Sequence, residues 1–111
     1  MDLQAQNTPC SLHRGDMPHA VYIMTNRPHG TLYVGVTNDL VRRVWQHREG
    51  LLPGFTRKYN LKRLVWCDAH EDIRTAIQRE KTMKHWPRQW KINVIEARNP
   101  EWRDLWEDLP S

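Results

Sequence analysis

The sequence has little cysteine and no long apolar run. Its only cysteines are Cys10 and Cys67, and neither a CxxC spacing nor an HxxxH or HxH pair suggests a zinc site. Cys10 falls in a polar stretch and Cys67 ends an apolar run, so we expect no disulfide between them. No segment has the length and apolarity of a membrane span or of a signal-peptide core. We therefore expect a reduced, cytoplasmic protein with no membrane partner.

The chain is short, and it has one phenylalanine beside six tryptophans. With 111 residues, 39% of them hydrophobic, we expect one domain with a small core. Residues 1–18 are polar and contain Pro and Gly, so they are expected to form a disordered leader before a single domain at 19–109. Four tryptophans have apolar neighbours at helical spacing, and core positions are expected for them, with base stacking as the alternative: Trp86, Trp90, Trp102 and Trp106.

Positive charge is concentrated in the middle of the chain. The formal net charge is +4, and residues 39–63 carry seven Lys or Arg against two acids, whereas residues 96–111 carry two against five. Such clustering favours an anionic partner, nucleic acid first. A solvated basic surface is the alternative, and charge alone does not decide between them.

Two short β-type runs each carry a tyrosine. Residues 21–24 and 32–36 are separated by turn-forming chemistry at 26–30, so they most simply pair as a hairpin. Because side chains alternate across a strand, the apolar residues share one face, and Tyr22, Tyr33 and Gly35 share the other. The pattern therefore predicts two phenols side by side, next to a glycine that leaves room for a close approach.

The rest of the chain predicts helices packed on a small sheet. We expect helices at 39–49, 71–85, 88–98 and 100–109, a loop at 51–60 and a third strand at 61–67. The order is ββαβαα(α), which predicts an α+β fold with a three-stranded antiparallel sheet flanked by helices.

Glu80 occupies an unusual position in the longest predicted helix. It falls within the apolar stripe formed by Ile73, Ala76, Ile77 and Met83. A carboxylate seldom lies buried without a cation or a metal as its partner. The alternative is a boundary residue paired with a basic neighbour such as Arg79 or Lys84.

Arg43 and His47 are four residues apart, so they project from one face of the first predicted helix. A solvated basic face is the alternative for this pair taken singly. Together with two phenols and a half-buried carboxylate, however, they make up the parts that phosphoryl transfer needs: a hard cation on oxygen, a fixed positive charge and a base.

At this point the sequence resembles the GIY-YIG nuclease superfamily, and closely its small single-domain bacterial members. Ala20-Val21-Tyr22 and Tyr33-Val34-Gly35 stand where the family has Gly-Ile-Tyr and Tyr-Ile-Gly, and Ala20 departs from that pattern. Gly35 to Leu40 with Arg43 and His47, the stretch 76–86 around Glu80, and Asn99-Pro100-Glu101-Trp102 with Asp104-Leu105 match its later motifs. The resemblance covers residues 20–109.

The resemblance implies a metal-dependent endonuclease that hydrolyses phosphodiester bonds in DNA. Glu80 would hold one divalent cation, Mg²⁺ or Mn²⁺, and products would carry 5′-phosphate and 3′-hydroxyl ends. Tyr22 would orient or deprotonate the attacking water, and Arg43 would stabilise the transition-state charge. His47 and Tyr33 would position groups or relay protons.

The resemblance also places Asn99 near the phosphate. The expected phosphate contacts are basic residues of the central segment: Arg42, Arg57, Lys58, Lys62 and Arg63. No appended targeting domain is expected, so target choice would come from nucleic-acid shape, oligomerisation or a protein partner. RNA is the alternative substrate. The alternative function is a nucleic-acid-binding module with weak or no catalysis that acts through a partner.

A phenol is a poor base at neutral pH. Its pKa of about 10 lies about three units above neutrality, so ionisation costs about 4 kcal/mol at pH 7. Arg43 and a bound cation would lower that cost, and His47 is the alternative acceptor of the phenolic proton. The sequence leaves the identity of the formal base open.

Overall fold

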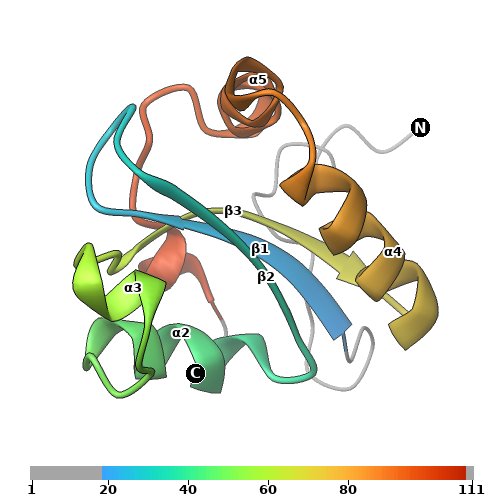
Figure 1. The fold of residues 1–111 in the computed structure, drawn as a ribbon, viewed down its shortest axis with the longest axis horizontal. Coiled ribbons are helices and arrows are strands. Elements are labelled where there is room, and N and C mark those ends of the chain that lie inside the picture. The colour runs from blue at the N-terminus through green and yellow to red at the C-terminus, as the bar shows by residue number, and fades with distance from the viewer. Residues whose placement is uncertain (1–18, 110–111) are drawn as a thin grey trace.

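The computed structural model describes residues 19–109, and the predicted leader at 1–18 lies outside them. The elements, in chain order, are β1 (His19–Thr25), β2 (Leu32–Thr37), α2 (Leu40–Arg48), α3 (Phe55–Lys58), β3 (Arg63–His70), α4 (Ile73–Lys84), α5 (Arg88–Arg98) and a 3₁₀ helix, η1 (Leu105–Asp108). The three strands form one antiparallel sheet in the order β2-β1-β3 (Figure 1). The predicted α+β class and the three-stranded antiparallel sheet flanked by helices are confirmed.

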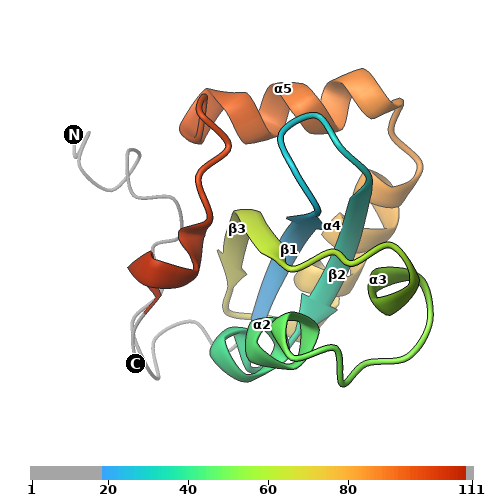
Figure 2. The same cartoon turned by 90° about the vertical axis from the view of Figure 1, so that its left-hand side faces the viewer.

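The central strand β1 has a core on each of its two faces. Val21 and Ile23 pack with buried residues of α4 and α5 on one side. Tyr22 and Met24 pack with α2 on the other side. In Figures 1 and 2, α4 and α5 lie on one side of the sheet, and α2 and α3 lie on the opposite side. The alternation along β1 thus separates the apolar face from the tyrosine face, as the sequence predicts.

Three elements differ from the predicted ones. The helix expected at 100–109 is present only as the 3₁₀ helix η1, Leu105–Asp108. The expected loop at 51–60 contains the short helix α3, which begins after Gly54, a residue with a φ of 101°. Strand β3 begins later and extends to His70, because it continues to pair with β1 as far as His19. The Pro53-Gly54 pair correctly predicts a break in regular structure, but it does not indicate the short helix that follows.

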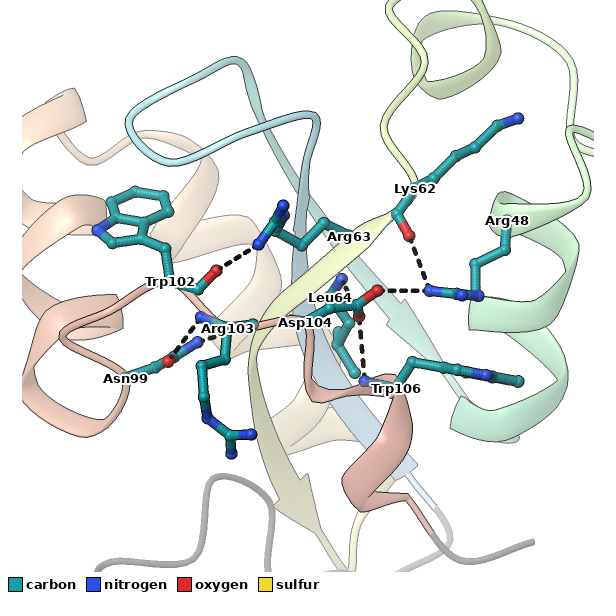
Figure 3. Close-up of polar contacts among 9 residues, drawn as sticks. All are labelled: Arg48, Lys62, Arg63, Leu64, Asn99, Trp102, Arg103, Asp104 and Trp106. Carbon is teal, nitrogen blue, oxygen red and sulfur yellow. Dashed lines mark hydrogen bonds and ion pairs between the residues drawn. The ribbon is translucent and has the colours of Figure 1, made fainter.

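The C-terminal segment, residues 99–108, covers the free edge of β3 (Figure 3). The Asp104 carboxylate accepts hydrogen bonds from the backbone N–H groups of Leu64 and Trp106, at 3.2 and 3.1 Å. The second carboxylate oxygen pairs with the Arg48 guanidinium at the end of α2. An edge strand exposes unpaired backbone groups, so these contacts satisfy part of that edge and tie it to α2.

The structure bears on two further expectations, the absence of a disulfide and the absence of a membrane span. Cys67 is disulfide-bonded in the structure, so the expectation that it is unpaired is wrong, and the inference of a reducing compartment loses that support. Cys10 lies outside the described residues. Within residues 19–109, no helix has both the length and the apolarity needed to cross a membrane.

Candidate active site

The Tyr22 ring lies across Gly35 of the neighbouring strand. The two residues are directly paired in the β1–β2 ladder. A Cβ placed on Gly35 would be 2.5 Å from both Cζ and Oη of Tyr22. Tyr22 is completely buried, and its ring centroid is 6.3 Å from that of Tyr33. The absence of a side chain at Gly35 is therefore what allows the Tyr22 phenol to extend over β2.

The Tyr22 hydroxyl is the first member of a buried hydrogen-bond chain. Its oxygen is 2.9 Å from His47 Nε2, and His47 Nδ1 is 3.1 Å from Thr56 Oγ1. His47 comes from α2 and Thr56 from α3, so both helices on this side of the sheet hold the chain in place. A protonated phenol donates to Nε2, which leaves Nδ1–H to donate to Thr56.

Burial keeps both members of this pair uncharged. Burial, followed by the neighbouring Tyr33, raises the pKa of the Tyr22 phenol well above its usual 10, although the charge and hydrogen bond of Arg43 oppose the rise. Burial, followed by the charge of Arg43, lowers the pKa of His47 from 6.5 to about 4. At neutral pH, Tyr22 is thus a neutral donor and His47 a neutral acceptor.

The lowered pKa of His47 predicts a loss of stability in mild acid. The unfolded chain binds a proton at His47 below about pH 6.5, whereas the folded chain does so only near pH 4. Stability therefore falls as pH falls through this window, with a contribution of up to about 3 kcal/mol. Urea unfolding at about pH 7 and about pH 4.5 measures this loss.

The matched comparison uses two single variants. His47→Gln should lack this part of the pH dependence, whereas His85→Gln, at the exposed C-cap of α4, should keep it. A His47→Gln protein with the same slope as the wild type would contradict the assignment of a neutral, buried imidazole.

Arg43 and His47 line a pocket beside the phenols. The pocket has a volume of about 230 Å³, and its walls come from β2, α2 and the segment 52–56. Its lining residues are Tyr33, Arg43, His47, Leu52, Pro53, Phe55 and Thr56. Arg43 is half-buried and supplies the positive charge of this wall. A guanidinium in a partly enclosed pocket is suited to binding phosphate oxygens.

Glu80 lies on α4, and its charge acts on the Tyr22 phenol. It is 9% exposed, and its charge contributes to the raised pKa of Tyr22. Its carboxylate is paired with Lys84 Nζ at 2.5 Å, one turn along the helix. The predicted burial is therefore present, and so is the ion pair with a basic neighbour that the sequence left as the alternative.

The donor set suits a hard cation that keeps water ligands. Among the described residues, no group of three His, Cys, Asp or Glu side chains converges on one point. Mg²⁺ does not need such a cage, because it is commonly held by one or two carboxylates, several waters and substrate phosphate. The Glu80 carboxylate already binds a cation, the Lys84 ammonium, so it is chemically suited to bind Mg²⁺.

Asn99 is hydrogen-bonded to the backbone of β3 and of the segment that follows α5. It ends α5, and its amide nitrogen donates to the carbonyls of Val65 and Arg103, at 3.2 and 2.9 Å. Its side-chain oxygen accepts from the Arg103 N–H at 3.0 Å (Figure 3). These contacts anchor the C-terminal segment on β3, and none of the described contacts of Asn99 involves Tyr22, Arg43 or His47. These contacts assign Asn99 a structural role, and its expected place near the phosphate stays a prediction.

The basic residues expected to contact phosphate are mostly exposed. Arg42, Arg57, Lys58 and Lys62 lie on the surface. Arg63 is half-buried, and its guanidinium donates to the Trp102 carbonyl at 2.9 Å (Figure 3). Arg63 is therefore engaged in a structural contact that ties β3 to the C-terminal segment.

Sequence reasoning missed two residues of the site. Thr56 bonds to His47, and Phe55 stacks beside Tyr33 with the ring planes 28° apart. Both lie in the segment predicted as a loop. Their positions depend on how α3 packs against α2, and no local spacing in the sequence indicates that contact.

A three-stranded sheet with paired tyrosines, an Arg–His helix and a buried glutamate defines a GIY-YIG catalytic domain. The family model described as "GIY-YIG catalytic domain" matches residues 18–93, and the chain belongs to this family. The predicted family membership is confirmed.

Bacterial UPF0213 proteins are similar to this chain. A UPF0213 protein of Bacillus pumilus (strain SAFR-032) is 36% identical over 67 residues, which cover 60% of this chain and 68% of that protein. One from Staphylococcus aureus (strain Mu3 / ATCC 700698) is 32% identical over 80 residues, 72% of this chain and 96% of that protein. The solution NMR structure of a UPF0213 protein from Bacillus halodurans superposes with a TM-score of 0.51 at 29% identity, covering 78% of this chain and 90% of that one.

Proposed function

We propose that this protein is a metal-dependent endonuclease that hydrolyses phosphodiester bonds in DNA. The observation that carries the proposal is that His47 belongs both to a buried phenol–imidazole pair with Tyr22 and to the wall of the pocket that Arg43 lines, with the charge of the buried Glu80 acting on the same phenol. A binding module has no need for a buried carboxylate beside two phenols. A hydrolase uses these groups to bind phosphate, to hold a cation and to move a proton.

The chain's own residues divide this work. Arg43 binds and stabilises the phosphate oxygens in the pocket, where charge develops during hydrolysis. Tyr22 orients the attacking water through its hydroxyl, and His47 Nε2 accepts the hydrogen bond of that hydroxyl and so holds the phenol in place. Thr56 holds the His47 ring through Nδ1, and Tyr33 closes the pocket beside it.

Glu80 would hold one Mg²⁺ or Mn²⁺. Such an ion would supply positive charge at the site, which would stabilise charge on the phosphate and favour the ionised form of the Tyr22 phenol that burial opposes. The raised pKa of Tyr22 supports this role, since the charge of Arg43 does not offset the effect of burial on the phenol.

A surface for the substrate extends outward from the pocket. The Tyr33, Phe55 and Tyr59 rings follow one another with centroid spacings of 6.3 and 4.8 Å, and Phe55 and Tyr59 are 47% and 43% exposed. Arg57 and Lys58 flank these rings on α3. Exposed rings can stack on unpaired bases, and the neighbouring cations can bind the phosphates of the same strand. We therefore expect nicked, branched or single-stranded DNA to be bound best.

Cleavage of labelled DNA tests the proposed function. Single-stranded, branched and fully paired oligonucleotides are incubated with the protein and Mg²⁺, with excess EDTA in a parallel reaction. We expect cleavage that EDTA abolishes, with the unpaired substrates cut faster, and products that DNA ligase can rejoin on a complementary splint. Ligation reports 5′-phosphate and 3′-hydroxyl ends.

Two other results would point elsewhere. Cleavage that persists at the same rate in EDTA would contradict the metal requirement. Salt-sensitive DNA binding with no cleavage of any substrate would favour the alternative, a nucleic-acid-binding module that acts through a protein partner.

A further inference from the structure

Lys84 is the last residue of α4, and its ammonium lies against Glu80 and over the Tyr33 ring. Nζ is 2.5 Å from Glu80 Oε2 and 5.6 Å from the centre of the Tyr33 ring. An ordinary pair on a helix surface has both partners in water, but the Glu80 side chain is only 12% exposed. The ammonium therefore lies where the buried carboxylate meets the wall of the pocket, since Tyr33 belongs to that wall.

From this position we propose that Lys84 is a built-in competitor of the divalent ion: it occupies the Glu80 carboxylate until the ion displaces it, and so sets the metal affinity of the protein. The inference rests on the proposed role of Glu80 as the metal ligand. It assigns to Lys84 a regulatory role distinct from the roles of the tyrosines, Arg43 and His47.

The ammonium and a divalent ion compete because they need the same carboxylate. A doubly charged ion on Glu80 would repel an ammonium held at ion-pair distance, and few directions of approach to a largely buried carboxylate remain. Lys84 can leave, because its side chain is 46% exposed and has a flexible four-carbon stem that reaches solvent. In the protein without the ion, the paired Lys84 ammonium offsets the free-energy cost of burying the Glu80 carboxylate.

Competition of this kind has a measurable consequence. The apparent metal affinity equals the intrinsic affinity multiplied by the fraction of time for which the carboxylate is free. If Lys84 occupies Glu80 about nine-tenths of the time, its removal should tighten metal binding about tenfold.

The experiment titrates Mn²⁺ into the DNA-free protein and counts the free ion by its electron paramagnetic resonance signal. Lys84→Met removes the ammonium and keeps the length of the side chain. We expect it to bind Mn²⁺ about tenfold more tightly than the wild type does. Lys84→Arg restores a cation at this position and should bind no more tightly than the wild type.

Lys81→Met is the matched control, because Lys81 is an exposed lysine of the same helix and its loss removes the same charge. We expect it to change the Mn²⁺ affinity less than about twofold, since exposed charges are screened by salt. Lys84→Gln is a second neutral variant in case Lys84→Met folds poorly by circular dichroism, and it should also bind more tightly than the wild type.

Glu80→Gln separates the role of Lys84 from that of Glu80. If it binds Mn²⁺ as the wild type does, Glu80 is not the ligand, and the metal assignment fails together with this inference. If Glu80→Gln loses binding while Lys84→Met and Lys84→Gln bind as the wild type does, only the role of Lys84 is overturned. Equal tightening in Lys81→Met and Lys84→Met would also overturn it, because the effect would then be general electrostatics.

Discussion

Replacing Glu80 by glutamine should abolish DNA cleavage and leave DNA binding almost unchanged. The substitution keeps the shape of a side chain that is 9% exposed, but it removes the charge that would hold the divalent ion. Loss of the ion's stabilisation of the developing charge is worth about 4 kcal/mol, which corresponds to about a thousandfold loss in cleavage rate. Single-turnover cleavage in Mg²⁺ and fluorescence anisotropy in Ca²⁺ measure the two properties separately.

The stability of the same variant excludes a trivial explanation. Glu80→Gln frees Lys84, whose side chain is already 46% exposed, so the unpaired ammonium is solvated at little cost. The melting temperature should therefore stay close to that of the wild type. Glu71→Gln is the matched control, because Glu71 is an exposed acid just before α4. It should cleave as the wild type does, and a comparable loss in both variants would contradict a specific role for Glu80.

Much of the tyrosine face could be predicted from the sequence because the responsible rules are local. Alternation along two short runs is enough to put Tyr22 and Tyr33 on one face, and the structure pairs their strands in that register. The spacing within one helix is likewise enough to indicate a buried position for Glu80 among Ala76 and Met83. Each of these predictions needs only the geometry of a single strand or helix.

Predictions that depend on contacts between elements were weaker. The 3.6-residue period does not determine whether a neighbouring layer covers a given position: Ala76 is buried, but Trp90, expected in the core, is 55% exposed. Phe55 and Thr56 reach the site through the packing of α3 on α2, which has no periodic pattern in the sequence. Asn99 illustrates the same limit, since its amide is used by the backbone of β3 and of the C-terminal segment.

The balance of forces on Tyr22 also required the structure. Sequence reasoning identified Arg43 as the group that favours the ionised phenol, and the structure does place Arg43 where it acts in that direction. Burial has the larger effect, so the net change in the pKa of Tyr22 is upward. The extent of burial depends on all layers around a side chain, whereas the identity of a charged neighbour four positions from His47 is visible in the sequence.

Replacing Gly35 by alanine should damage both the fold and the site through one contact. The new Cβ would lie 2.5 Å from Cζ and Oη of Tyr22, closer than real Cβ contacts are. Tyr22 is fully buried and bonded to His47, so the ring cannot move without breaking that bond or disturbing the core. We expect a loss of about 1–3 kcal/mol in the free energy of unfolding, from overpacking. Cleavage should fall about a hundredfold or more, because the hydrogen-bonded Tyr22–His47 pair loses the alignment that positions the attacking water.

Gly50→Ala is the control that separates the two effects of the Gly35 substitution. Gly50 has a φ of 69°, and a Cβ placed on it would have no neighbour within 4 Å, so alanine there costs about 1–2 kcal/mol of backbone strain and touches nothing in the pocket. Urea unfolding should show similar losses for the two variants, while cleavage by Gly50→Ala should remain near that of the wild type under conditions where both are folded. If Gly35→Ala also cleaves normally, the Tyr22 hydroxyl does not need the position over Gly35 that the structure gives it. Since the substitution at Gly35 acts on Tyr22 through steric contact alone, the comparison tests the geometry of the site without changing any of its polar groups.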